Sequence, residues 1–359
     1  MATKGGGRIL IEDEFLGERF AERFPGREFS RLPPIGPADY SAFGRRDLLV
    51  TRHRGAFIKP CPATPNYNCC GLAIFHFGLG CTMGCRYCIL EAYLGAEALA
   101  LFGNVEEGLA ELKNILALPP DKRPKRFCTG EFTDSLLLDE NTALAARMAP
   151  IFAKSRAATL ELKTKTDRVD HLLGLEHNGR TVISFSVNAP GVCRSEEAGA
   201  APLPARLEAA RRAAKAGFPI GLHFDPLIDH PGWEDGYRET VRLIGQHLGQ
   251  ATVAWVSLGC FRYLPSLKNV MLERRPGTRI YDGEFIRGGD GKMRYPRPLR
   301  ARMYKALVAA LKETLRPETV IYMCMESPRL WRDVFGHDPS TEGLTALLDR
   351  RALELSGEV

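Results

Sequence analysis

Short apolar runs alternate with amphipathic segments along most of this chain. From residue 72 onward, runs of strand length rich in β-branched or aromatic residues recur at 72–78, 126–130, 159–165, 181–188, 219–225, 252–258 and 319–325. Segments with apolar residues at helical spacing lie between them, at 106–118, 205–216, 235–248 and 299–315. Strands that alternate with helices predict right-handed βαβ units and a parallel sheet.

Six or seven such units in about 250 residues fit a partial or full TIM-like (β/α) barrel. In this α/β fold the chemistry lies at the carboxyl ends of the strands. Residues 1–70 are rich in Pro, Gly and Arg, and we expect them to form an irregular N-terminal extension that packs on the barrel. The predicted barrel domain covers residues 71–330, and residues 331–359 are expected to form a C-terminal tail.

The composition is typical of an ordered globular protein. Of the 359 residues, 45% are hydrophobic and 26% are charged, which excludes wholesale disorder. No window approaches 18 uncharged apolar residues and the N-terminus lacks the apolar core of a signal peptide, so we expect no membrane association and a cytoplasmic location. Ten cysteines are too dilute for a disulfide scaffold and indicate metal binding, redox chemistry or burial.

Positive charge gathers in one segment. The whole chain carries a formal net charge of +6, whereas residues 262–305 contain twelve basic and four acidic residues, a net charge of +8. A local cationic surface of this kind attracts a polyanion such as DNA. A solvated face or a set of internal ion pairs is consistent with the same count, so charge alone leaves both interpretations open.

Three cysteines follow the first strand of the predicted barrel. Cys81, Cys85 and Cys88 have the spacing C-x3-C-x2-C on one short loop that contains glycine. Cysteine thiolates are the usual ligands of iron–sulfur clusters. Three thiolates on a cubane cluster leave one iron open to a substrate or cofactor. The position of the loop directly after a barrel strand favours an iron–sulfur cluster.

The same loop is compatible with a zinc site or with buried thiols. A structural zinc site would need a fourth ligand, and the nearby Cys69, Cys70 and His76 do not have a familiar zinc-ribbon spacing. Free cysteines also pack as small hydrophobic residues, so three unliganded thiols are the second alternative.

The segment GCTMGCRYC resembles the signature of the radical S-adenosylmethionine (SAM) enzymes. The resemblance implies a [4Fe-4S] cluster held by the three cysteines, with SAM on the open iron. One electron, from a reductant such as flavodoxin or ferredoxin, then cleaves SAM to a 5′-deoxyadenosyl radical that abstracts hydrogen. Tyr87, before the third cysteine, fits the superfamily pattern. Thr129, Gly130 and Glu131, at the end of the second strand, resemble the segment that contacts the SAM amino group.

The resemblance extends to the spore photoproduct lyase family over about residues 71–304. The most specific stretches are GCTMGCRYCILEAYLG, FTDSLLLDE, LKTKTDRVDHLLGLEHNGRTVISFSVN and PARLEAARRAAKAGFPIGLHFDPLIDHPGWEDGY. It implies that Lys165 and Ser186 contact SAM, with Asn188 beside them. Arg294 and Tyr295 resemble a pair that holds the lesion, and they lie with Arg262 in the basic segment.

Two positions depart from the family pattern. Glu131 stands where the family has the cysteine that returns hydrogen to the product radical, and a carboxylate is a poor hydrogen-atom donor. Ile89 replaces a tyrosine of the same return path. Cys128 lies three residues upstream of Glu131, an offset that points to the opposite face of a strand. We expect the cluster, SAM and the first hydrogen abstraction to be retained.

Three functions are therefore weighed. The first is a radical SAM lyase that repairs thymine-dimer photolesions in DNA, with the lesion flipped out of the base stack. The second is a radical SAM enzyme of the same fold that acts on another nucleoside, RNA or a metabolite, because a fold does not fix a substrate. The third is a non-catalytic nucleic-acid-binding module with a structural cluster.

Overall fold

The apolar runs of the sequence build the main sheet of the molecule. The computed structural model describes residues 7–15, 20–64, 66–94, 98–249 and 251–358. Within these residues the strand order of the main sheet is β16-β12-β11-β10-β9-β8-β5-β4. Its strands are β4 (Ile58–Pro60), β5 (Ala73–Phe75), β8 (Arg126–Cys128), β9 (Thr159–Thr164), β10 (Thr181–Ser186), β11 (Ile220–Leu227), β12 (Val253–Cys260) and β16 (Val320–Met323).

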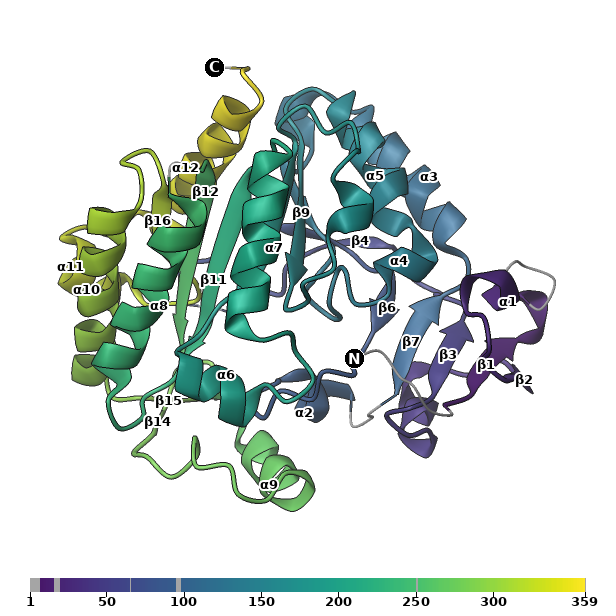
Figure 1. Cartoon of the computed structure of the whole chain (residues 1–359), viewed down its shortest axis with the longest axis horizontal. Helices are drawn as coiled ribbons and strands as arrows, with labels where there is room; N and C mark the ends of the chain where they lie inside the picture. The colour runs from purple at the N-terminus through teal and green to yellow at the C-terminus, as the bar shows by residue number, and fades with distance from the viewer. Residues whose placement is uncertain (1–6, 16–19, 65, 95–97, 250, 359) are drawn as a thin grey trace.

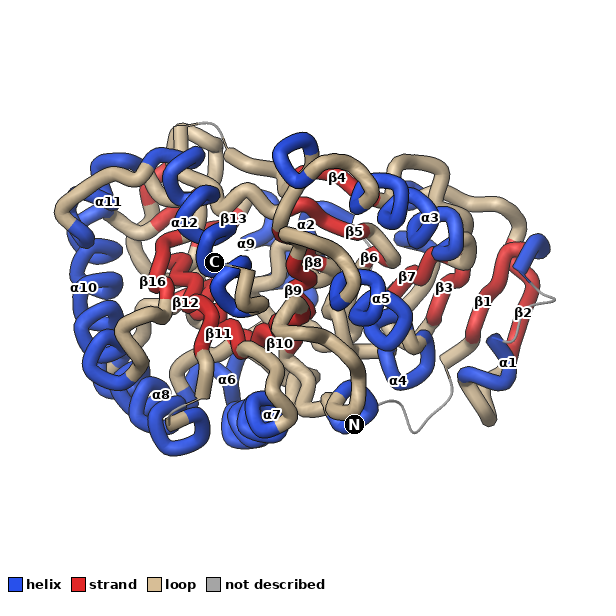
Figure 2. Tube along the Cα trace, turned by 90° about the horizontal axis from the view of Figure 1, so that it is seen from above, coloured by secondary structure: helices blue, strands red, loops and turns tan. Residues whose placement is uncertain are grey.

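The main sheet is a partial barrel. The strands from β5 to β16 are parallel and follow the chain order across the sheet, whereas β4 pairs antiparallel with β5 at one edge. Seen from above, the sheet curves into an open arc with helices on its outer side (Figure 2). Each predicted run overlaps one of these parallel strands, so the predicted TIM-like α/β fold is confirmed in its partial form.

The helices between the strands cover the outer face of the arc (Figure 1). They include α3 (Val105–Leu116), α5 (Leu144–Ala153), α7 (Leu203–Lys215), α8 (Trp233–Leu248) and α10 (Arg297–Thr314). The four expected helices are confirmed to within two residues at each end. The chain leaves α7 at Gly217, whose φ of +90° lies in the left-handed region that favours glycine.

The N-terminal segment contains regular structure instead of the expected irregular extension. A second sheet has the order β2-β1-β3-β7-β6 and lies beside the barrel in Figure 1. Its strands are β1 (Ile9–Glu12), β2 (Phe29–Leu32), β3 (Leu48–Thr51), β6 (Gly78–Leu79) and β7 (Leu99–Phe102). Strands of four residues or fewer between turns carry too little periodicity to stand out. Three strands of this sheet lie before residue 70, where the extension was expected to end, and two lie after it.

Shorter elements complete the chain. A small antiparallel sheet contains β13 (Arg262–Tyr263), β15 (Met293–Arg294) and β14 (Ile286–Arg287). The remaining α-helices are α1 (Phe20–Arg23), α2 (Leu90–Leu94), α4 (Asp139–Thr142), α6 (Pro190–Glu196), α9 (Pro265–Arg274), α11 (Pro328–Phe335) and α12 (Ser340–Leu355). The C-terminal helix α12 buries Leu344 and Leu348. Among the described residues, no helix has the length and apolar character needed to cross a membrane.

Candidate active site

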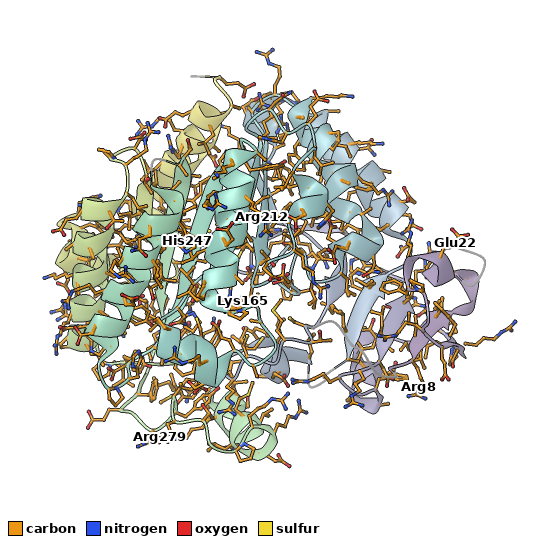
Figure 3. The ribbon with its side chains drawn as sticks, in the orientation of Figure 1. Arg8, Glu22, Lys165, Arg212, His247 and Arg279 are labelled. Atoms are coloured by element: carbon orange, nitrogen blue, oxygen red, sulfur yellow. The ribbon has the colours of Figure 1, made fainter. Side chains whose placement is uncertain are left out.

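A cavity of about 300 Å³ lies at the carboxyl ends of the parallel strands. This is the end of the barrel where the fold predicts chemistry. Its lining includes Cys81, Cys85, Tyr87, Cys88, Gly130, Glu131, Lys163, Lys165, Ser186, His223, Asp225, Arg262 and Lys292. Figure 3 shows Lys165 near one end of α7. The structure thus brings the three cysteines together with most of the residues expected to bind SAM.

The three cysteines lie on the loop between β6 and α2. The loop is held by backbone hydrogen bonds from Cys88 to Cys85 (3.1 Å) and from Arg86 to Glu196 (2.9 Å). Gly84 has a φ of +64°, and a Cβ there would lie 2.0 Å from a guanidinium nitrogen of Arg45. Only glycine therefore fits this turn without a shift of its neighbours.

The chemistry of the donor set fits an iron–sulfur cluster. Cys81, Cys85 and Cys88 carry free thiols, and burial raises the pKa of all three, that of Cys85 to about 12. They are therefore neutral thiols until a metal displaces the protons. Among the described residues, no three His, Cys, Asp or Glu side chains are placed to hold a single metal ion. In a cubane each thiolate binds a different iron, so the sulfurs need not converge on one point.

A buried ion pair anchors the cysteine loop to the barrel. The Tyr87 hydroxyl donates to Glu197, whose second oxygen accepts from Arg206. The side chains of Glu197 and Arg206 are each 1% exposed. The ammonium of Lys165 lies 5.6 Å from the centre of the Tyr87 ring. Burial, and then the charge of Glu197, raise the pKa of Tyr87 well above its ordinary value.

Some residues at the end of β8 line the cavity, whereas others are buried in the interior. Gly130 and Glu131 line the cavity, and the Glu131 carboxylate lies 3.8 Å from the ammonium of Lys163. A Cβ at Gly130 would lie 2.7 Å from the Lys163 Cβ, so a side chain does not fit there. Thr129 and Cys128 are buried and are not part of the cavity lining as described; the Thr129 hydroxyl donates to Ser135 at 2.7 Å.

The residues after β9 and β10 are positioned by other buried groups. The Asp134 carboxylate accepts from the backbone N–H of Lys165 at 2.8 Å and from the Thr164 hydroxyl at 2.8 Å. Lys165 and Ser186 line the cavity, as the sequence predicts. Asn188 does not: its side chain donates to the Pro226 carbonyl and accepts from the Tyr237 hydroxyl. Asn188 therefore holds strand ends together.

Sequence reasoning missed a buried polar network below the cavity. One oxygen of Glu161 accepts hydrogen bonds from Ser184 (2.6 Å), His223 (2.8 Å) and the Trp255 indole (2.8 Å). Burial alone would raise the pKa of Glu161, but the charges of Lys163 and His223 and the hydrogen bonds from His223 and Ser184 lower it below its ordinary value. His223 also lines the cavity. The signal available in the sequence was a carboxylate between two leucines inside a predicted strand.

Of the three residues expected to bind the substrate, only Arg262 belongs to the cavity lining as described. Arg262 lines the cavity, and its guanidinium binds both oxygens of Asp225 at 3.2 Å. Arg294 is 2% exposed, pairs with Asp290 at 2.6 Å and is not part of the cavity lining as described. Tyr295 is equally buried, and its hydroxyl accepts from the Asp229 N–H at 3.0 Å. Arg294 and Tyr295 are thus buried and hydrogen-bonded to Asp290 and to the backbone of Asp229, so the structure gives them internal partners and not a place in the cavity lining as described.

Much of the basic segment is likewise paired with carboxylates. Besides those of Arg262 and Arg294, the described ion pairs of the segment are Arg274–Glu91, Arg275–Glu91, Arg279–Asp282, Lys292–Asp290, Arg297–Asp333, Arg300–Glu326 and Arg302–Glu234. Most of these acidic residues lie outside residues 262–305, so the charge count of the segment alone did not include them. The local cationic field is therefore weaker than a net charge of +8 suggests.

Comparisons with known proteins agree with the sequence resemblance. The chain is 33% identical over 209 residues to the spore photoproduct lyase of Bacillus subtilis (strain 168), which covers 57% of this chain and 60% of that protein. It is 30% identical over 206 residues to the spore photoproduct lyase of Geobacillus sp. (strain Y412MC61), covering 56% and 60%. The matching segment thus spans about three fifths of these curated relatives.

Solved structures match the fold. A spore photoproduct lyase double mutant with bound AdoMet and dinucleoside spore photoproduct superposes with a TM-score of 0.77 at 24% identity, covering 89% of this chain and 99% of that one. A spore photoproduct lyase complexed with dinucleoside spore photoproduct gives a TM-score of 0.75 at 23% identity, with the same coverage. The family profile described as spore photoproduct lyase matches residues 70–323. The chain therefore belongs to the spore photoproduct lyase family.

Proposed function

We propose that this protein is a radical SAM enzyme of the lyase type. The observation that carries the proposal is the meeting of three free thiols from one loop with Lys165 and Ser186 at the carboxyl ends of the barrel strands. Cys81, Cys85 and Cys88 would hold a [4Fe-4S] cluster, and SAM would occupy the cavity beside it. When bound, these two cofactors supply hydrogen-atom abstraction from a substrate.

The cavity residues are suited to hold SAM. The ammonium of Lys165 offers charge-assisted hydrogen bonds to a carboxylate, and the Ser186 hydroxyl can donate to or accept from a ribose hydroxyl. Burial opposes the charge of Lys165, but the pKa of Lys165 is raised above its ordinary value, with the carboxylate of Glu197 among the causes, so the ammonium stays protonated. The Glu131 carboxylate suits the SAM amino group. Gly130 leaves room for close approach.

For the substrate, we propose a thymine-dimer photolesion in DNA. The curated relatives are named spore photoproduct lyases, and two matching structures hold the dinucleoside spore photoproduct. Arg262 and Lys292 line the cavity, where their remaining N–H groups would donate to a phosphate while Asp225 and Asp290 stay paired with them. A one-electron reductant such as flavodoxin or ferredoxin, and a cytoplasmic location, belong to the same proposal.

One observation favours a second candidate, a radical SAM enzyme with another nucleoside, RNA or metabolite substrate. Glu131 lines the cavity where the family resemblance places the hydrogen-donor cysteine. Cys128, the nearest thiol in the sequence, is fully buried on β8 and is not part of the cavity lining as described. The return of hydrogen to a thymine product would then need a different group.

Two products separate these candidates. Reduced, cluster-loaded protein is incubated with SAM and a synthetic dinucleoside spore photoproduct, and the formation of 5′-deoxyadenosine and of thymidine is measured. Thymidine formation supports lesion repair, because breaking the methylene bridge leaves both glycosidic bonds intact. Deoxyadenosine without thymidine supports the second candidate, and a panel of irradiated DNA and RNA then identifies the substrate class. A cluster-loaded protein that forms neither product would contradict both.

A further inference from the structure

A second cavity lies between the barrel and the N-terminal sheet. Its volume is about 420 Å³, within the ~300–1,000 Å³ typical of small-molecule sites. Tyr40, Leu79 and Phe102 contribute buried or half-buried apolar surface. Phe132 borders this cavity and also the main cavity, so the two are neighbours that share a wall.

Aromatic rings form a row along this second cavity. The ring centroids of Phe102 and His53 are 4.4 Å apart at 20°, those of His53 and His76 are 6.3 Å apart at 15°, and those of His76 and Phe132 are 4.8 Å apart at 28°. His53 is held in its loop by two contacts. Its backbone N–H donates to the side-chain oxygen of Asn104, and its ring Nε2 lies 3.1 Å from the Ala56 carbonyl oxygen. His76 and Phe132 are half-buried and present their surface to the cavity.

The charged groups of the second cavity are cationic. Arg52, Arg54 and Lys59 line it, and the described lining contains no acidic side chain. Arg52 is paired with Glu107 at 2.5 Å and with Glu14 at 2.7 Å. The guanidinium of the exposed Arg54 lies 3.8 Å from the buried carboxylate of Glu12. Among the described residues, no carboxylate pairs with the exposed Lys59 ammonium, which lies on the edge strand β4.

The ring nitrogens of His76 are available to a ligand. Its ring nitrogens have no hydrogen-bond partner among the described residues, and its place between rings leaves them available to a ligand. Burial, with Lys59 and His53, lowers the pKa of His76 to about 4, so the ring is neutral at pH 7. A neutral imidazole can stack on a base through its face, while the donor and the acceptor at its edge suit the sugar and phosphate oxygens of the same nucleotide.

We propose that the second cavity binds a nucleotide of a single-stranded nucleic acid, with its base stacked against His76 and Phe132 and its phosphate at Lys59 and Arg54. Aromatic platforms beside cations are how proteins bind single strands without reading sequence. The shared wall at Phe132 places this nucleotide next to the substrate in the main cavity. The inference rests on the proposed function in one respect, which is that the ligand is a nucleic acid.

Binding of undamaged DNA tests the inference without requiring catalysis. Fluorescein-labelled single strands of two and of eight thymidines are titrated into the protein, and their anisotropy is followed at several salt concentrations. His76→Ala should weaken binding of the eight-nucleotide strand by about 5- to 100-fold through lost stacking. Lys59→Ala should lower the slope of log affinity against log salt by about 0.7. Both variants should bind the two-nucleotide strand as the wild type does, because we expect that strand to occupy the main cavity and not to extend into the second cavity.

Matched variants and a second readout keep the outcomes distinct. Lys113→Ala, an exposed lysine on α3 that lines neither cavity, should bind as the wild type, and His76→Phe should retain most of the binding because it keeps a ring. Circular dichroism confirms folding of each variant. Deoxyadenosine production reports on the proposed function separately. Unchanged binding in both Lys59→Ala and His76→Ala, or equally tight binding of free thymidine monophosphate, would overturn the inference.

Discussion

The buried carboxylate of Glu197 connects the cysteine loop to the rest of the barrel, and its removal should disturb both stability and cluster binding. It accepts from Tyr87, which lies between two of the cysteines, and from the guanidinium of Arg206. Removing one partner of a buried ion pair costs about 3–5 kcal/mol, because the other charge stays buried without its counter-ion. That is a large share of a total stability of about 5–15 kcal/mol.

The assay for Glu197→Ala combines urea unfolding with cluster content. With a denaturant slope of about 3 kcal/mol per molar, the urea midpoint should fall by roughly 1 to 2 M. Iron and acid-labile sulfide per chain should fall as well, because Tyr87 no longer holds the loop. Glu197→Gln keeps an acceptor for the tyrosine and should retain more cluster than the alanine variant. Glu208→Ala, which removes an exposed partner of Arg211, is the matched control and should leave both measurements unchanged.

A midpoint and an iron content equal to those of the wild type would refute this reasoning. It would mean that the Arg206 charge finds another partner or water, and that the loop does not depend on Tyr87 for its position.

Three further predictions concern the cavity and its supports. Glu131→Cys removes a partly exposed pair with Lys163, worth at most about 1 kcal/mol, and should increase the formation of thymidine from the dinucleoside lesion. Unchanged thymidine formation would argue that the residue is not at the hydrogen-return position. Because the pKa of Glu161 is lowered, its stabilisation is present above the unfolded value of about 4.3 and is lost as pH falls through the folded value. Glu161→Gln should therefore flatten the decline of urea midpoint between about pH 5 and pH 3, and an undiminished slope would contradict that. Gly84→Ala must adopt a left-handed backbone against Arg45 and should lower iron content, whereas full cluster loading would show that the turn adapts.

The barrel could be predicted because its signal is local. Parallel strands buried on both faces read as continuous apolar runs, and the helices between them carry a complete apolar stripe. The three cysteines lie within one loop, and their spacing together with the position of that loop directly after a barrel strand favoured a shared ligand. The N-terminal strands, such as β1 (Ile9–Glu12) and β3 (Leu48–Thr51), are too short for periodicity to separate them from turns.

The supports of the site could not be predicted, because they join residues that are distant in the sequence. Tyr87 and Glu197 are 110 positions apart, and Glu161 and His223 are 62 apart. A charged residue in a sequence is usually solvated, and only the tertiary fold decides which ones are buried against a partner. The same reason applies to Arg294, for which the charge count left a cationic surface and an internal ion pair both open, and which the fold pairs with Asp290.

The central claim is that Cys81, Cys85 and Cys88 hold a cluster that cleaves SAM in the cavity they share with Lys165. The most direct measurement is iron and sulfide content of anaerobically reconstituted protein, taken together with 5′-deoxyadenosine formed after reduction with SAM. The account predicts about four irons per chain and deoxyadenosine in the wild type, and loss of both when the three cysteines are replaced by alanine. Zinc or no metal in the wild type, or deoxyadenosine production that survives the triple replacement, would contradict it.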